Sequence, residues 1–170
     1  MFDGEGSNLE RAGWGQAAVD DYARRRAALG REPTGEEEVQ MALAACAAGA
    51  RFYPEERDRA HLLGEDRELA EGVVLDLLAN VLHAADGLVV PQLLVTAVAA
   101  VEQFDEQART EDWRRLGPGR GFGEFLVAVR HALVTVHDLD FDGMLESAVQ
   151  TFHEEAEEER FHRVAAERAR

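Results

Sequence analysis

Apolar residues recur along this chain at the three- and four-residue spacing of an amphipathic helix. The densest stretch lies within residues 65–86, where apolar positions cover most of the helix circumference: Val73, Val74, Leu75, Leu77, Leu78, Val81, Leu82, Ala84 and Ala85. A helix that is apolar on most sides is usually buried on most sides. The pattern therefore predicts a buried central helix, and no stretch shows the period of two that is typical of a β-strand.

Capping residues and helix breakers divide the rest of the chain into further helices. Thr34 followed by Glu37 fits a capping box, which predicts a helix from there to about Phe52, before Pro54. Asp140 is a suitable N-cap for a last helix, whose apolar stripe consists of Phe141, Leu145, Ala148, Phe152 and Ala156. Other helices are predicted over residues 9–29, 91–110 and 122–137, with a short one after Pro54.

A repeat is visible in the second half of the chain. A shift of about 48 residues aligns residues 71–110 with 122–158, and it pairs His83 with His131 and Phe104 with Phe152. Residues 117–123, Gly-Pro-Gly-Arg-Gly-Phe-Gly, are predicted to form a flexible linker between the two copies. We interpret the repeat as a duplicated helical hairpin, because a second hairpin can cover the apolar face that one hairpin leaves exposed.

The composition is that of a folded chain. It has 170 residues, of which 46% are hydrophobic, enough to form one sizeable core. The predicted fold is therefore all-α, a bundle or array of about six helices in a single domain over residues 1–170, with residues 1–8 flexible.

The charge limits the classes of partner. The formal net charge is −16, and all 18 basic residues are Arg. Such a field repels nucleic acid and anionic membrane surfaces, so neither is expected as a partner, although an acidic nucleic-acid mimic is an alternative. Cys46 is the only cysteine and lies in an apolar helical run, which indicates a core residue. The chain lacks an apolar stretch of membrane-spanning length and an apolar signal core, so a cytoplasmic location is expected.

A polar stripe interrupts the central helix. Asp76, Asn80 and His83 are spaced i, i+4, i+7 and therefore share one helix face. Together with Glu124 and His131 of the second repeat they are the candidate site residues, since an acid, an amide and an imidazole can line a cleft. The alternative is structural: a solvated stripe, or buried groups satisfied by hydrogen bonds between helices.

Part of this stripe resembles a known pattern. The segment from Asp76 to Asp86, Asp-Leu-Leu-Ala-Asn-Val-Leu-His-Ala-Ala-Asp, is similar to a motif of small helical proteins from actinobacteria and their phages. The second half of that motif resembles residues 140–155 here, about one repeat length away. The resemblance covers about a third of the chain and implies a helical fold without implying an activity.

A second resemblance suggests an enzyme. The all-α nucleotide pyrophosphatases of the MazG-like family bind Mg²⁺ with paired acids on two helices, and two pairs here are similar: Glu68 with Glu71, and Glu102 with Asp105. Paired carboxylates suit a hard cation that also holds substrate phosphates. Acid pairs at this spacing are common in so acidic a chain, and the gap between the two pairs is longer than in that family.

The favoured hypothesis is a small non-enzymatic regulatory or protein-interaction protein, for which a phage or mobile-element origin is one interpretation. Its partner would be another protein or a second copy of itself, and no cofactor is expected. The acid run at residues 154–159 could dock an Arg-rich partner. The alternative hypothesis is the Mg²⁺-dependent nucleoside triphosphate pyrophosphatase.

Overall fold

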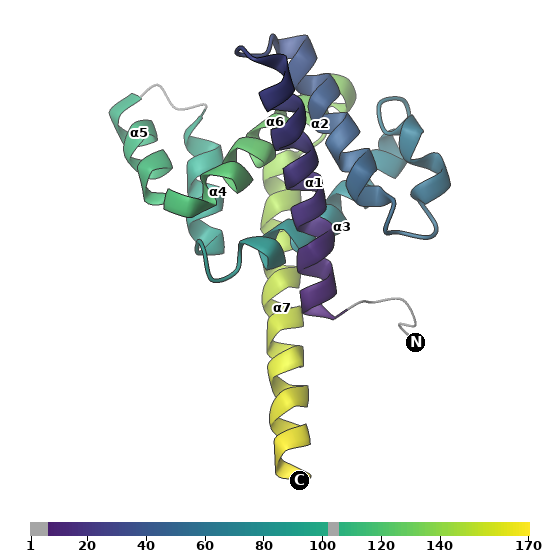
Figure 1. Ribbon diagram of the computed structural model, residues 1–170, viewed down its shortest axis with the longest axis vertical. Coiled ribbons are helices and arrows are strands. Elements are labelled where there is room, and N and C mark those ends of the chain that lie inside the picture. Colours follow the sequence, from purple (N-terminus) through teal and green to yellow (C-terminus); the bar gives the residue numbers. More distant parts are fainter. Residues whose placement is uncertain (1–6, 102–105) are drawn as a thin grey trace.

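The computed structural model describes residues 7–101 and 106–170, and over these ranges the chain is built from helices, as the sequence predicted (Figure 1). In chain order the elements are α1 (Asn8–Leu29), α2 (Gly35–Ala50), the short 3-10 helix η1 (Arg57–Leu62), α3 (Arg67–Ala85), α4 (Pro91–Ala100), α5 (Glu106–Arg115), the 3-10 turn η2 (Gly117–Gly119), α6 (Arg120–His137) and α7 (Phe141–Arg168).

The predicted caps are present. Thr34 and Glu37 form both halves of a capping box, because the Glu37 N–H donates to Thr34 Oγ1 at 3.2 Å and the Thr34 N–H donates to Glu37 Oε2 at 2.8 Å. Asp140 caps α7 by accepting the Gly143 N–H at 3.1 Å. The flexible tail predicted for residues 1–8 lies mostly outside the described residues, and Ser7 already caps α1.

Two predicted boundaries differ from the structure. The single helix expected over 91–110 is two helices: α4 ends at Ala100 and α5 begins at Glu106. The expected flexible linker is instead a 3-10 turn followed directly by α6. Two of its four glycines permit close packing: a Cβ on Gly119 would meet Val89 Cγ1 at 2.7 Å, and one on Gly123 would meet Leu116 Cδ1 at 2.8 Å. A flexible segment is therefore the wrong interpretation of these glycines.

The central position of α3 is confirmed. Twelve of its residues are buried, and it packs most extensively against α1 and then against α7. The two helices approach closely at Gly15 of α1, where an added Cβ would lie 2.2 Å from the Asn80 carbonyl oxygen. Apart from Ala79 and Ala100, the buried apolar residues of the described chain form one cluster that runs from Ala18 to Phe152.

The last helix leaves the body of the protein halfway along its length. Figure 1 shows the C-terminal half of α7, in yellow, extending away from the other helices. Phe152 is its last buried residue, and every residue from 157 to 170 is exposed. We call residues 157–168 the projecting segment.

The duplicated hairpin stays a prediction. The first helices of the two copies would be α3 and α6, and the second would be α4 with α5 and then α7. The second helix of the hairpin is thus divided into α4 and α5 in one copy and is the single helix α7 in the other. In addition, α7 packs more against α3 than against α6. The proposed equivalence of Phe104 with Phe152 cannot be followed, since Phe104 lies outside the described residues.

Within the part of the chain that the structure describes, every helix is either too short or too polar to cross a lipid bilayer.

Candidate functional site

The predicted polar stripe borders a pocket beside the root of α7. The pocket has a volume of about 410 Å³ and lies between α1, α3, α7 and the segment after α2. Asp76 and Asn80 line it, together with the polar or aromatic side chains of Arg11, Trp14, Tyr53 and Glu155. Asp76 is exposed, whereas Asn80 is buried.

Asn80 is tied to Tyr53. Its Nδ2 donates to the Tyr53 hydroxyl oxygen at 2.5 Å, and both side chains are buried. Trp14 covers this pair, with its ring edge-on to Tyr53 at 6.2 Å between centroids. Burial raises the pKa of Tyr53 well above its ordinary value, and the nearby charge of Asp76 acts in the same direction. Tyr53 is therefore neutral, and the hydrogen bond fixes the segment after α2 to the central helix.

His83 is part of a charged network that joins three helices. Its Nε2 lies 2.7 Å from Glu155 Oε2, so α3 is linked to α7. The other Glu155 oxygen forms an ion pair with Arg11 of α1. Asn8 adds hydrogen bonds from its Nδ2 to the Glu155 carbonyl oxygen at 3.3 Å and to Glu159 Oε2 at 2.7 Å.

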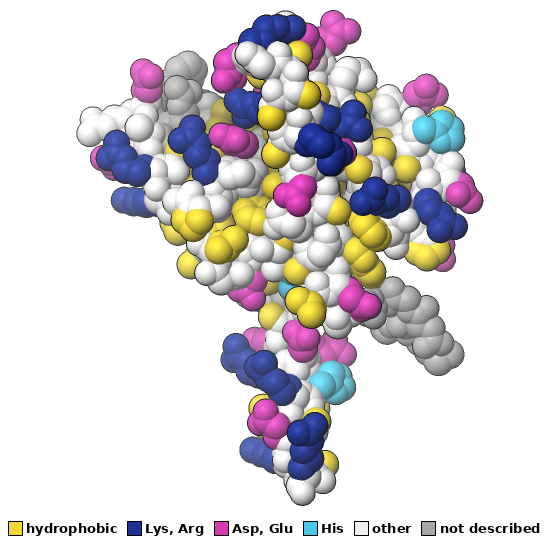
Figure 2. Space-filling view, viewed as in Figure 1, with side chains coloured by type: hydrophobic (Ala, Val, Ile, Leu, Met, Phe, Trp, Pro, Cys, Tyr) yellow, Lys and Arg dark blue, Asp and Glu magenta, His cyan; other side chains and the backbone are white. Residues whose placement is uncertain are grey.

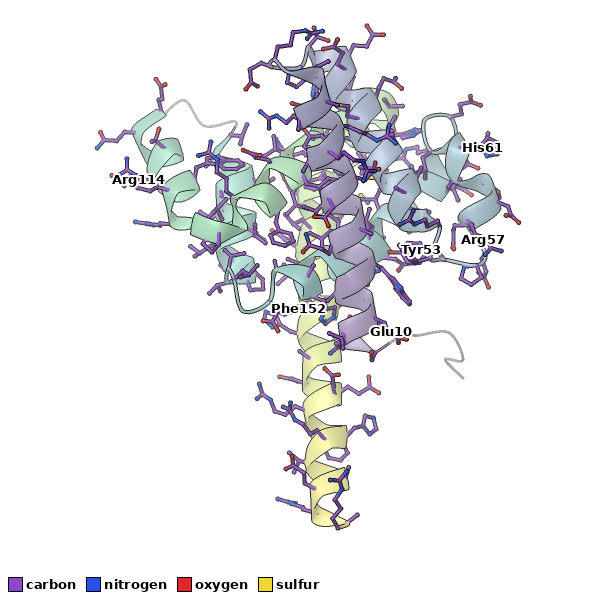
Figure 3. All side chains as sticks on the ribbon, in the orientation of Figure 1. Glu10, Tyr53, Arg57, His61, Arg114 and Phe152 are labelled. Atoms are coloured by element: carbon purple, nitrogen blue, oxygen red, sulfur yellow. The ribbon has the colours of Figure 1, made fainter. Side chains whose placement is uncertain are left out.

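This network favours an ionised Glu155. Burial raises the pKa of the carboxyl group, but the hydrogen bond with His83 and the positive charge of Arg11 lower it more, so the pKa is below its ordinary value. The Phe152 ring packs on His83 with 4.8 Å between ring centroids. Figure 3 labels Phe152 at the level where α7 leaves the body. The network therefore holds the root of α7 and fixes the direction in which the projecting segment extends.

Glu124 and His131 lie on α6, and their partners differ from those of the polar stripe on α3. His131 Nδ1 lies 2.9 Å from Glu38 Oε1 of α2. Glu124 pairs with Arg26 of α1 at 3.5 Å and with Arg120 at 3.2 Å. The five candidate residues are thus held in two clusters: Asp76, Asn80 and His83 beside the root of α7, and Glu124 with His131 among α1, α2 and α6.

Tyr22 belongs to the second cluster and was not predicted. It is buried against the Phe125 ring at 5.8 Å between centroids. Burial, aided by the charge of Glu38, raises the pKa of Tyr22 to about 12. A tyrosine on an apolar helix face has no distinct sequence signal, because only tertiary packing decides what surrounds its hydroxyl group.

The proposed metal-binding acids are only partly visible. Glu68 and Glu71 lie in the first two turns of α3, where Glu71 is 3.9 Å from Arg67. Glu102 and Asp105 lie outside the described residues. Over residues 7–101 and 106–170, no three His, Cys, Asp or Glu side chains are grouped so that they could hold a metal ion. The Mg²⁺ site therefore stays a prediction.

Cys46 is buried, which raises the pKa of its thiol to about 12 and fits the predicted core role.

The projecting segment has two features that sequence reasoning missed. Phe161 is 72% exposed and Val164 is 39% exposed, three residues apart on one helix face. The charges are also unevenly distributed: residues 157–159 are all Glu, and the four Arg of the last fourteen residues all follow at positions 160, 163, 168 and 170, with one further acid, Glu167, among them. Figure 2 shows basic and acidic side chains along the extended helix. The acid run was noted in the sequence, but only the structure shows that the helix carrying it projects.

Comparison with known proteins finds no matching family model, no similar curated protein and no similar solved structure.

Proposed function

We propose that this chain is a non-enzymatic regulatory or protein-interaction protein, and that the projecting segment of α7 is its docking element. The observation that carries the proposal is the exposure of Phe161 and Val164 on a helix that extends away from the body. A large aromatic side chain in that position loses the stabilisation of about 1.5–3 kcal/mol that burial would give it. Burial against a partner would recover this free energy.

The helical conformation of the segment supports the same function. Residues 157–168 amount to about three turns, and an isolated helix of that length is only marginally stable in water. Here the first half of α7 is packed against α3, and Arg11 and His83 hold Glu155. The body therefore extends a helix that is already formed at its root, so less conformational entropy is lost on binding than for a disordered segment.

Site-specific photo-crosslinking in the source cells tests the proposal. A photoreactive amino acid is placed at Phe161, and a matched control carries it at Ala166, which is also exposed but lies almost opposite on the helix. The proposal predicts a discrete adduct of higher mass from position 161 and little from position 166. Equal adducts from both positions, or none from position 161, would contradict it. Mass spectrometry of the adduct identifies the captured chain.

A further inference from the structure

One face of the projecting segment has the residue order of a short coiled-coil seam. Glu157, Phe161, Val164 and Arg168 are spaced i, i+4, i+7, i+11, which is the alternation of four and three residues that keeps side chains on one helix face. All four are exposed. The seam therefore has two apolar positions in its centre, an acid at the end near the body and a base at the far end.

We propose that the occupant of this seam is a second copy of the chain, paired antiparallel along α7. This inference rests on the proposed function and names its partner. In an antiparallel pair, Phe161 of each copy lies opposite Val164 of the other. The same register places Glu157 of each copy opposite Arg168 of the other. Two apolar layers are thus flanked by two ion-pair layers, and one seam is complementary to its own copy.

The charge of the segment favours this occupant. The projecting segment and the two residues after it, 157–170, contain four Glu and four Arg, so they are neutral in a chain whose formal net charge is −16. Two copies that approach through this segment avoid the repulsion that their bodies would experience. Parallel pairing would place Glu against Glu at position 157 and Arg against Arg at position 168, which is unfavourable. The separation of charges along α7 therefore selects the antiparallel orientation.

Sedimentation velocity of the purified full chain tests the pairing. We expect a monomer–dimer equilibrium with a dissociation constant on the order of micromolar, because the contact is smaller than a standard interface. Phe161→Glu should give a monomer over the same concentration range, whereas the control Ala166→Glu on the opposite face should leave the dimer. Both positions are exposed, so circular dichroism should show an unchanged fold in each variant.

Charge reversal tests the orientation. Arg168→Glu and Glu157→Arg should each weaken the dimer about tenfold, since each replaces two ion pairs by two like-charge contacts. The double variant Glu157→Arg/Arg168→Glu should restore it, and a mixture of the two single variants should form a heterodimer. Unchanged affinity in the single variants would overturn the antiparallel register.

The two proposals fail in different ways. If the wild-type chain is monomeric at about 100 times the expected dissociation constant, self-pairing is refuted. An adduct between position 161 and a different protein would then still support the docking function, whereas the absence of any adduct would refute both proposals.

Discussion

Replacing Gly15 by Ala tests a close backbone contact between α1 and α3, the two most extensively packed helices. A Cβ at position 15 would lie 2.2 Å from the Asn80 carbonyl oxygen and 2.6 Å from the Val81 nitrogen. These are backbone atoms inside a helix, so no side-chain rotation can make room for the methyl group. The helices α1 and α3 would have to separate by about 1 Å to reach an ordinary contact distance.

The expected magnitude follows from two opposing effects. Alanine in a helix interior is favoured over glycine by about 1 kcal/mol. Inserting a methyl group into a closely packed contact costs about 1–3 kcal/mol, and the cost is larger when backbone must move. We therefore expect a net loss of about 1–3 kcal/mol for Gly15→Ala. Gly13 is the matched control on the same helix, because a Cβ there meets nothing within 4 Å. Gly13→Ala should stabilise the protein by about 0.5–1 kcal/mol.

Urea denaturation followed by circular dichroism measures both variants. With a slope of about 2 kcal/mol per molar urea, Gly15→Ala should lower the unfolding midpoint by about 0.5–1.5 M, while Gly13→Ala should raise it slightly. If Gly15→Ala were as stable as Gly13→Ala, the close crossing of α1 and α3 at this residue would be refuted. If Gly15→Ala and Gly13→Ala destabilised the protein equally, the loss of stability would come from the backbone of α1 and not from its crossing with α3.

Other predictions concern the root of α7 and the titratable groups. Phe152→Ala should cost about 3–5 kcal/mol in urea denaturation because the ring is buried, whereas Phe161→Ala at an exposed position should cost less than about 0.5 kcal/mol in the monomer. Glu155→Gln should cost about 1–3 kcal/mol at neutral pH and speed hydrogen exchange in the first half of α7; unchanged exchange would show that the network does not hold the helix. Because the pKa of Glu155 is lowered, its contribution is present above the ordinary value of 4.5 and is lost as the pH falls below it, so the variant should lose less stability on acidification. The pKa of Tyr22 is raised from 10.0 to about 12, so its contribution should be constant below pH 10 and decline between these values; Tyr22→Phe should lack that part of the decline. Mg²⁺ should leave the melting temperature unchanged, and a rise accompanied by pyrophosphate release from a nucleoside triphosphate would favour the enzyme hypothesis instead.

The sequence by itself determined where most helices begin and end. The caps at Thr34 with Glu37, at Asp140 and at Gly30 each act through hydrogen bonds and backbone angles within a few residues of one helix end. Their effect can therefore be predicted from the local sequence. The same holds for the buried character of α3, because an almost continuous apolar circumference leaves few sides for water.

The tertiary structure alone decided what the polar stripe and the glycines do. The side chains of Asn80 and His83 form hydrogen bonds with Tyr53 and Glu155, respectively, which are distant in the chain. The structural role of Asn80 and His83 therefore depends on which helices come together. The glycines near position 120 resemble a linker in sequence, yet two of them, Gly119 and Gly123, are positions where neighbouring side chains pack directly against the backbone of η2 and α6. The periodicity of α7 predicts a helix for its whole length, but periodicity is a property of one helix and contains no information about where its neighbours end. The projection of its last turns, and with it the exposure of Phe161, follows only from the finite length of α1 and α3 beside it.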